Sequence, residues 1–93
     1  MIRDKAMNNQ APDPAVLLLG ALAWICADDD RASRLLAVTG LEPDMLRLHA
    51  TDSAILGATG QFLADHEPDL LACATALDST PAAIMAATRT LAG

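Results

Sequence analysis

Histidine and carboxylate side chains are the first candidates for chemistry in this chain, and they come close together at two places. His66 stands between Asp65 and Glu67, and His49 lies near Asp52. Neighbouring residues on a helix point about 100° apart, so Asp65, His66 and Glu67 do not converge on one ion. Zinc and di-metal sites favour the spacings HxxxH or ExxH, and the sequence contains neither. The pattern predicts no metal or cofactor site; His66 is expected to close the end of a helix, where an imidazolium suits the helix dipole.

Three consecutive aspartates, Asp28, Asp29 and Asp30, form a second candidate cluster. Calcium-binding loops of the EF-hand type present spaced oxygen ligands around a central glycine. The triplet has neither the spacing nor the glycine. It is therefore expected to form a turn between two helices, with one aspartate capping the second helix.

Hydroxyl and thiol groups offer the remaining route to chemistry. Ser53, Ser79 and Thr80 stand near expected helix starts, where a hydroxyl caps the backbone. Cys26 and Cys73 lie inside apolar segments without a CxxC pair, so each is expected to be a small buried thiol in a reducing, cytoplasmic compartment. The sequence has no GxSxG elbow and no glycine-rich phosphate loop. These observations predict that the protein is not an enzyme.

Proline marks where the elements that carry these residues begin. A capping residue directly precedes proline at Asp13-Pro14, Glu42-Pro43, Glu67-Pro68 and Thr80-Pro81. Proline at the first helical position loses no hydrogen bond. With "DDDR" and "TDSA" as further starts, six helices are expected over residues 14–27, 30–39, 43–50, 53–66, 68–77 and 81–91. No segment alternates polar and apolar residues for long enough to form a half-buried strand. The sequence predicts a single all-α domain over residues 13–93, preceded by a polar, disordered tail over residues 1–12.

The first expected helix contains thirteen apolar residues in a row, residues 15–27. A membrane-spanning helix needs about 20 apolar residues, whereas a run of about 10–14 is typical of a buried core helix or a signal sequence. The preceding residues 1–14 hold two acids, two bases and two prolines rather than a short positive leader. We therefore expect no membrane segment. Because this helix is apolar all round, it is predicted to be the most buried element of the fold.

An internal repeat relates the two halves of the chain. "LLLGALAWICAD" at residues 17–28 aligns without a gap with "AILGATGQFLAD" at residues 54–65, at an offset of 37 residues. After a two-residue slip, "LLA" at residues 35–37 meets "LLA" at residues 70–72. The repeat predicts a compact six-helix bundle built from two three-helix units that are related by an approximate two-fold axis.

Small residues recur on one side of the first helix in each half. They are Gly20, Ala21, Ala23 and Ala27 in the first copy, and Gly57, Ala58, Gly60 and Ala64 in the second. Glycine inside a helix costs about 1 kcal/mol relative to alanine, so its recurrence at matched sites indicates close backbone approach. We therefore expect the first and fourth helices to cross closely at the centre of the molecule.

A longer stretch carries a family resemblance. "LGALAWICADDDRASRLLAVTGLEPD" and the later "TDSAILGATGQFLAD" resemble a family of small bacterial proteins of unknown function, found largely in alphaproteobacteria. The shared features are a helix that ends in an acidic step, a "TGL-acid-Pro" turn and a "D-x-x-[FI]-L" helix. The resemblance covers residues 15–92 and implies a compact, helical, cytoplasmic protein. It implies no activity, so no site residue follows from it.

Binding functions remain after catalysis is set aside. Twelve acidic residues against six basic ones give a net charge of −6, which opposes binding to nucleic acid or to an anionic membrane. Trp24 aligns with Gln61 in the repeat, so it is either a surface residue or a plain core tryptophan. Exposed Trp and Met are favoured interface anchors. The sequence therefore favours a protein–protein interaction module or a homo-oligomer, with Trp24, Met45 and Met85 as candidate contacts.

DNA binding is the alternative. Residues 31–50 have the outline of a helix-turn-helix motif, with a glycine turn between two helices. In that interpretation Arg47 on the second helix approaches the bases, and Arg31 and Arg34 on the first helix contact the DNA backbone. Asp44, in the first turn of the second helix, repels phosphate. The charge pattern therefore ranks DNA binding below protein binding.

Overall fold

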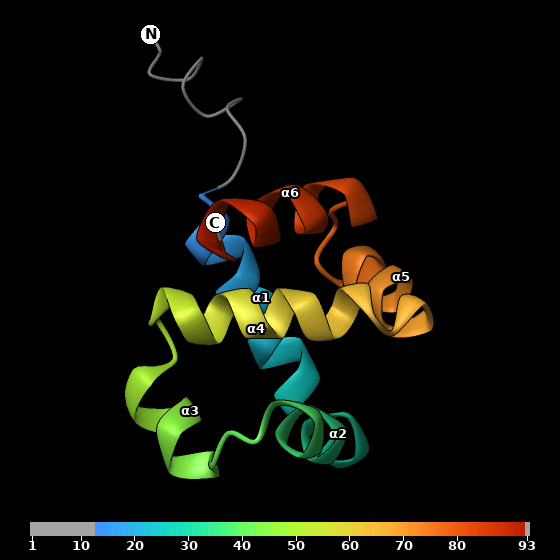
Figure 1. Cartoon of the computed structure of the whole chain (residues 1–93). Helices are drawn as coiled ribbons and strands as arrows, with labels where there is room; N and C mark the ends of the chain where they lie inside the picture. Colours follow the sequence, from blue (N-terminus) through green and yellow to red (C-terminus); the bar gives the residue numbers. More distant parts are fainter. Residues whose placement is uncertain (1–12, 93) are drawn as a thin grey trace, which may run out of the picture.

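The computed structural model describes residues 13–92, which form six α-helices and no strand (Figure 1). The helices are α1 (Pro14–Cys26), α2 (Asp29–Thr39), α3 (Pro43–His49), α4 (Ser53–Ala64), α5 (Glu67–Ala76) and α6 (Pro81–Ala92). Every predicted helix boundary lies within two residues of the observed one, and the all-α prediction is confirmed. The tail that was predicted over residues 1–12 lies outside the described residues.

Local capping explains where several helices begin. The carboxylates of Asp13, Asp28 and Asp52 accept hydrogen bonds from backbone N–H groups in the first turns of α1, α2 and α4, at 2.8, 3.0 and 2.8 Å. Proline occupies the first turn of α1, α3 and α5. Within the aspartate triplet, Asp28 is the residue that caps α2, which agrees with the expectation of one capping aspartate.

Two helices cross at the centre of the molecule, and the others surround the crossing (Figure 1). α1 and α4 pack against each other, α6 packs on both, and α2 lies on the opposite side of the crossing from α6. The predicted crossing of the first and fourth helices is therefore confirmed. The core is apolar, and its largest fully buried apolar side chains are Phe62, Leu18, Ile25, Leu35, Leu56, Leu63 and Ile84.

The glycines of α1 and α4 do not mediate this crossing, contrary to the prediction. A β-carbon added at Gly57 would lie 3.6 Å from the backbone of Ala92, and one added at Gly60 would collide with the side chain of Thr88. Both neighbours belong to α6. A β-carbon added at Gly20 would face the residue that follows α5. The α4 glycines therefore allow α6 to approach closely; the prediction was wrong because a small face does not reveal which neighbour will cover it.

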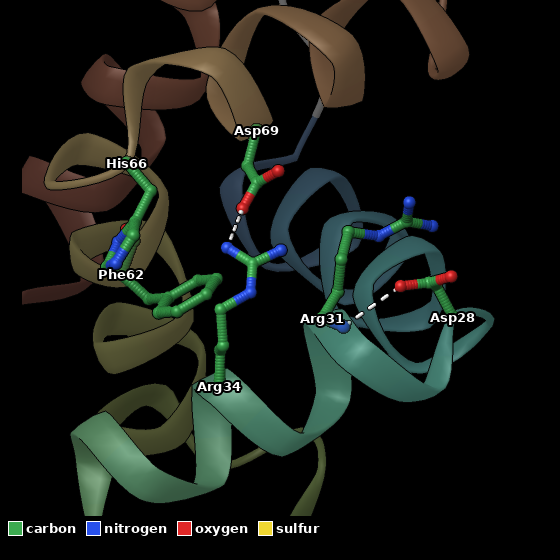
Figure 2. Close-up of polar contacts among 6 residues, drawn as sticks. All are labelled: Asp28, Arg31, Arg34, Phe62, His66 and Asp69. Atoms are coloured by element: carbon green, nitrogen blue, oxygen red, sulfur yellow. Dashed lines mark hydrogen bonds and ion pairs between the residues drawn. The ribbon is translucent and has the colours of Figure 1, made fainter.

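The first two helices of each half follow the predicted repeat. α1 packs on α2 of its own half and on α5 of the other half, and α4 packs on α5 and α2 in the same way. Arg34 and Asp69 are equivalent after the two-residue slip, and their side chains form an ion pair of 2.8 Å between α2 and α5 (Figure 2). Equivalent residues meet in this way near a two-fold axis.

The third helices do not follow the repeat. α6 has twelve residues and packs on α1, α4 and α5, whereas α3 has seven residues and packs extensively on no other helix among residues 13–92. Ile84, Ala87 and Thr88 of α6 are buried, and α3 contributes no buried residue. The prediction of two equivalent three-helix units is therefore wrong in the third helix, where the two halves differ in helix length.

α4, rather than α1, is the most buried helix. Seven residues of α4 are buried, against four in α1. Val16, Leu19, Ala23 and Cys26 of α1 are exposed, so the prediction that the first helix is the most buried element is wrong. An apolar circumference does not ensure that every face receives a neighbour. Among residues 13–92 no single helix has the length and hydropathy of a membrane span. Helices α5 and α6 have that length and hydropathy only when taken together, and they are bent by 103° relative to each other.

Candidate functional site

An open apolar groove runs along the exposed face of α1, with a volume of about 480 Å³. One wall is formed by four residues of α1, namely Leu19, Leu22, Ala23 and Cys26. The rest of the lining comes from α2, from α3 and from the residue that caps the end of α3, namely Ala32, Leu36, Pro43, Leu46, Arg47 and Ala50. We call this feature the α1–α3 groove. Arg47 is the one charged residue in its lining, so the interior is almost entirely apolar.

The groove face of α1 is the repeat equivalent of a buried face of α4. At the offset of 37 residues, Leu19, Ala23 and Cys26 correspond to Leu56, Gly60 and Leu63. The three α4 residues are buried and the three α1 residues are exposed. Leu56 has 0% of its surface exposed, whereas Leu19 has 37%. The groove therefore lies where the packing that encloses α4 is not repeated around α1.

The short helix α3 forms the outer wall of the groove. Leu46 and Ala50 are partly buried and pack against the core, whereas Met45 and Leu48 are 42% and 75% exposed. A helix rises about 1.5 Å per residue, so the seven residues of α3 span roughly 10 Å and the twelve residues of α6 roughly 18 Å. α3 is thus shorter than α6, and it lines the groove without packing extensively on α1.

Acidic residues lie close in sequence to several residues of the groove lining. Arg47 donates a hydrogen bond to Asp44 at 2.7 Å, and both side chains are mostly exposed. Glu42 is the N-cap residue of α3. Asp29 lies one turn before the lining residue Ala32, on the same face of α2. Asp44 therefore pairs with the guanidinium of Arg47, and Glu42 and Asp29 add two acidic residues close in sequence to the lining residues Pro43 and Ala32.

The two cysteines have different environments. Cys73 is fully buried, and burial raises the pKa of its thiol to about 11, although the nearby charge of Arg31 acts in the opposite direction. Cys26 is exposed in the groove, and partial burial raises the pKa of its thiol as well. Both thiols are free. The prediction of a buried thiol is confirmed for Cys73 and wrong for Cys26, because the groove face of α1 is open. Raised pKa values disfavour the nucleophilic thiolate form at neutral pH.

The three predicted contact residues do not gather at the groove. Trp24 is partly buried against the core, and the guanidinium carbon of Arg31 lies 3.7 Å from the centre of its ring. Met85 is also partly buried against the core. Met45 is exposed on α3, and it is not among the residues that line the groove. As individual partner contacts these residues stay predictions.

The three arginines of the predicted DNA-binding element each have a partner within the chain. Arg31 donates a hydrogen bond to the carbonyl oxygen of Trp24 at 2.9 Å and stacks over its ring. The other two form ion pairs, Arg34 with Asp69 at 2.8 Å and Arg47 with Asp44 at 2.7 Å. Figure 2 shows Arg34 directed at the carboxylate of Asp69. Arg34 and Arg47 would therefore have to exchange a carboxylate for a DNA phosphate.

His66 closes the end of α4, as predicted. Its Nδ1 atom lies 2.7 Å from the carbonyl oxygen of Phe62, so Nδ1 carries the proton and donates it to the hydrogen bond. The imidazole also stacks on the Phe62 ring, with the ring centres 4.4 Å apart (Figure 2). Within residues 13–92 no group of three or more His, Cys, Asp or Glu side chains is placed to hold a metal ion.

Sequence analysis does not identify Leu19, Ala23 and Cys26 as surface residues. The signal that could have found them is a mismatch between the two copies of the repeat. The apolar positions of α1 match buried positions of α4, yet the helix expected over residues 43–50 is shorter than the one expected over residues 81–91. A short third helix beside a fully apolar first helix indicates an uncovered apolar face.

Comparison with known proteins gives the family of the chain. The family model described as "Protein of unknown function (DUF3572)" matches residues 11–93. The chain belongs to this family. No curated protein and no solved structure matches the chain. Membership of the DUF3572 family confirms the resemblance to a family of unknown function, and the geometry of the groove is therefore the basis for a functional proposal.

Proposed function

We propose that the protein is a non-catalytic protein–protein interaction module that binds its partner through the α1–α3 groove. A single observation carries the proposal: Leu19, Ala23 and Cys26 are exposed, although the residues that match them in α4 are buried. Exposed apolar area that is continuous and rimmed by polar residues is characteristic of interaction sites. A partner that occupied the groove would remove this apolar face from water.

The lining favours a protein segment over a small polar ligand. Small-molecule sites combine apolar walls with several convergent polar groups that fix the orientation of the ligand. The α1–α3 groove supplies Arg47 and the thiol of Cys26, and its other lining residues are apolar. An open apolar surface of this kind suits side chains presented at intervals by another chain.

The same features support a protein without catalytic activity that works in the cytoplasm. A catalytic site needs a nucleophile or base whose pKa is matched to its task, and the pKa of the groove thiol is raised rather than lowered. The two free cysteines suit a reducing compartment. The positions of Arg34 and Arg47, each paired with a carboxylate, give no support to DNA binding as a second function.

The test compares Ala23→Gln, in the groove, with Ala72→Gln, on the exposed face of α5. Both alanines are exposed on helices, and glutamine is a good helix former, so both variants should keep the fold. The tagged full chain is cross-linked in its cell of origin and captured. We expect the same partner with the wild-type chain and with Ala72→Gln, and its loss with Ala23→Gln. Capture of that partner by all three proteins would contradict the proposal.

The exposed thiol offers a second measurement on the same complex. Cys26 lines the groove and Cys73 is fully buried, so iodoacetamide should modify Cys26 in the native protein and leave Cys73 unmodified. A bound partner should slow the alkylation of Cys26. An unchanged rate in the purified complex would show that the partner binds elsewhere.

A further inference from the structure

We propose that the occupant of the α1–α3 groove is an amphipathic helix of a partner protein, with an apolar face built like that of α6 and basic residues beside it. This inference deepens the proposed function and rests on it. It identifies the partner by the chemistry that the groove recognises: a helical segment rather than an extended one, small and aliphatic anchors, and positive flanking charge.

The helical form follows from the way in which α4 is enclosed. α6 packs along α4, and Gly60 permits this because it leaves room for Thr88. Ala23 is the repeat equivalent of Gly60 but carries the β-carbon that would collide with Thr88 at Gly60, so an occupant helix seated as close to α1 as α6 is to α4 must present a residue smaller than threonine opposite Ala23. Interfaces with small residues let two helix backbones come near each other. The groove therefore suits a helical neighbour like that of α4, seated farther from the α1 backbone because Ala23 carries a β-carbon.

The length of the groove sets the spacing of the anchors. Its α1 wall extends from Leu19 to Cys26, which spans about 10 Å at 1.5 Å per residue. Two turns of an occupant helix fit this length, with anchors at positions i, i+3 or i+4, and i+7. α6 presents that pattern to its own neighbours with Ile84, Ala87, Thr88 and Leu91, of which the first three are buried and the last packs on the core.

Charge determines the residues beside the anchors. Asp44 neutralises Arg47, whereas Glu42 and Asp29 lie close in sequence to lining residues, and the whole chain carries a net charge of −6. A helix that enters with Lys or Arg on either side of its apolar stripe gains from this potential, and an acidic helix is repelled. Arg89, the one charged residue of α6, shows that a basic side chain is compatible with an apolar stripe of this type.

Two labelled synthetic peptides test the inference. Both carry the sequence of residues 81–92, so they share the apolar stripe of α6. One contains Ala82→Lys, Ala86→Lys and Thr90→Lys, and the other contains glutamate at the same three positions, which are exposed in α6. Fluorescence anisotropy with the full chain measures the affinity of each peptide at low and at high salt. Alkylation of Cys26 reports whether a bound peptide occupies the groove.

We expect the lysine peptide to bind on the order of tenfold more tightly than the glutamate peptide at low salt, with a smaller difference at high salt. It should slow the alkylation of Cys26, and Ala23→Gln should weaken its binding by a similar factor whereas Ala72→Gln should not. Equal affinities, tighter binding of the glutamate peptide, or no binding of either peptide would overturn the inference.

The outcomes separate this inference from the proposed function. If neither peptide binds but Ala23→Gln still abolishes capture of a partner, the groove is an interaction site and its occupant is not a basic helix. If the chain associates with itself and Ala23→Gln dissolves that association, a second copy is the occupant and the inference is wrong. If the lysine peptide binds but capture does not depend on Ala23, the proposed function fails.

Discussion

α1 and α4 are equivalent helices that end up in different environments. Both cross at the centre, and both pack on the second helix of each half. α4 is enclosed because a twelve-residue third helix lies along it, whereas α1 keeps an exposed apolar face beside a seven-residue third helix. The comparison teaches that the α1–α3 groove arises from a difference between α3 and α6 rather than from any unusual feature of α1 itself.

The largest expected difference comes from leucines at equivalent positions. Leu56 is fully buried and Leu19 is 37% exposed. Leu56→Ala should lower the free energy of unfolding by about 2–5 kcal/mol, since it leaves a cavity in the core. Leu19→Ala should lower it by about 1 kcal/mol or less, because the lost side chain is partly in water and no closed cavity forms. Urea unfolding followed by circular dichroism measures both, and similar losses would show that α1 is as well enclosed as α4.

The next largest effect on stability is expected at Gly60, which leaves room for Thr88 of α6. Alanine at Gly60 would bring a β-carbon within 2.8 Å of the Thr88 β-carbon. Overpacking costs about 1–3 kcal/mol, which exceeds the gain of about 1 kcal/mol that alanine brings to a helix. Gly60→Ala should therefore be destabilising in urea unfolding. Thr88→Ala in the same chain should recover part of the loss; additive effects of the two changes would mean that α6 does not press on this position.

Substitutions just after α2 and just after α5 are expected to change the free energy of unfolding by smaller amounts and in opposite directions. α2 ends at Gly40 with φ of 74°, and Asp78 follows α5 with φ of 56°. Asp78→Gly should raise the free energy of unfolding by about 0.5–1 kcal/mol, because glycine adopts positive φ without strain. Gly40→Ala should lower it by about 1 kcal/mol for the same reason. Each kcal/mol shifts the melting temperature by about 4–8 °C in a domain of this size, so thermal unfolding resolves both changes.

The smallest effect is expected in α3. Leu48 is 75% exposed and α3 has no buried residue, so Leu48→Ala should change the free energy of unfolding by no more than about 0.5 kcal/mol. Amide hydrogen exchange should be faster in α3 than in α6, because elements with few buried contacts open locally at low free energy. Equal protection of the two helices would remove the asymmetry on which the groove depends.

Most of the helix boundaries were predictable because their causes are local. Asp13 with Pro14 and Asp52 with Ser53 mark the starts of α1 and α4 within a few residues of sequence, and the structure has caps at both aspartates. The groove was not predictable in the same way. Leu19 and Leu56 have similar local sequences, and their different exposure depends on helices that lie far away along the chain.

The cysteines and arginines also show that the surroundings of candidate site residues depend on contacts that local sequence does not reveal. Both cysteines lie in apolar segments, and only the packing around them separates buried Cys73 from exposed Cys26. The pairing of Arg34 with Asp69 joins residues that are 35 positions apart. The pairing of Arg47 with Asp44 is local, three residues apart on one helix, whereas no pattern of neighbouring residues indicates that Arg34 meets Asp69.

The sequence by itself determined the six helices, their caps and the relation between the two halves, because hydrogen bonding within a turn and apolar periodicity act over a few residues. Only the tertiary structure decided which face of each helix is covered. α6 reaches along α4 and α3 does not reach along α1, and this difference in helix–helix contact leaves an apolar surface where the repeat alone would have placed a buried one.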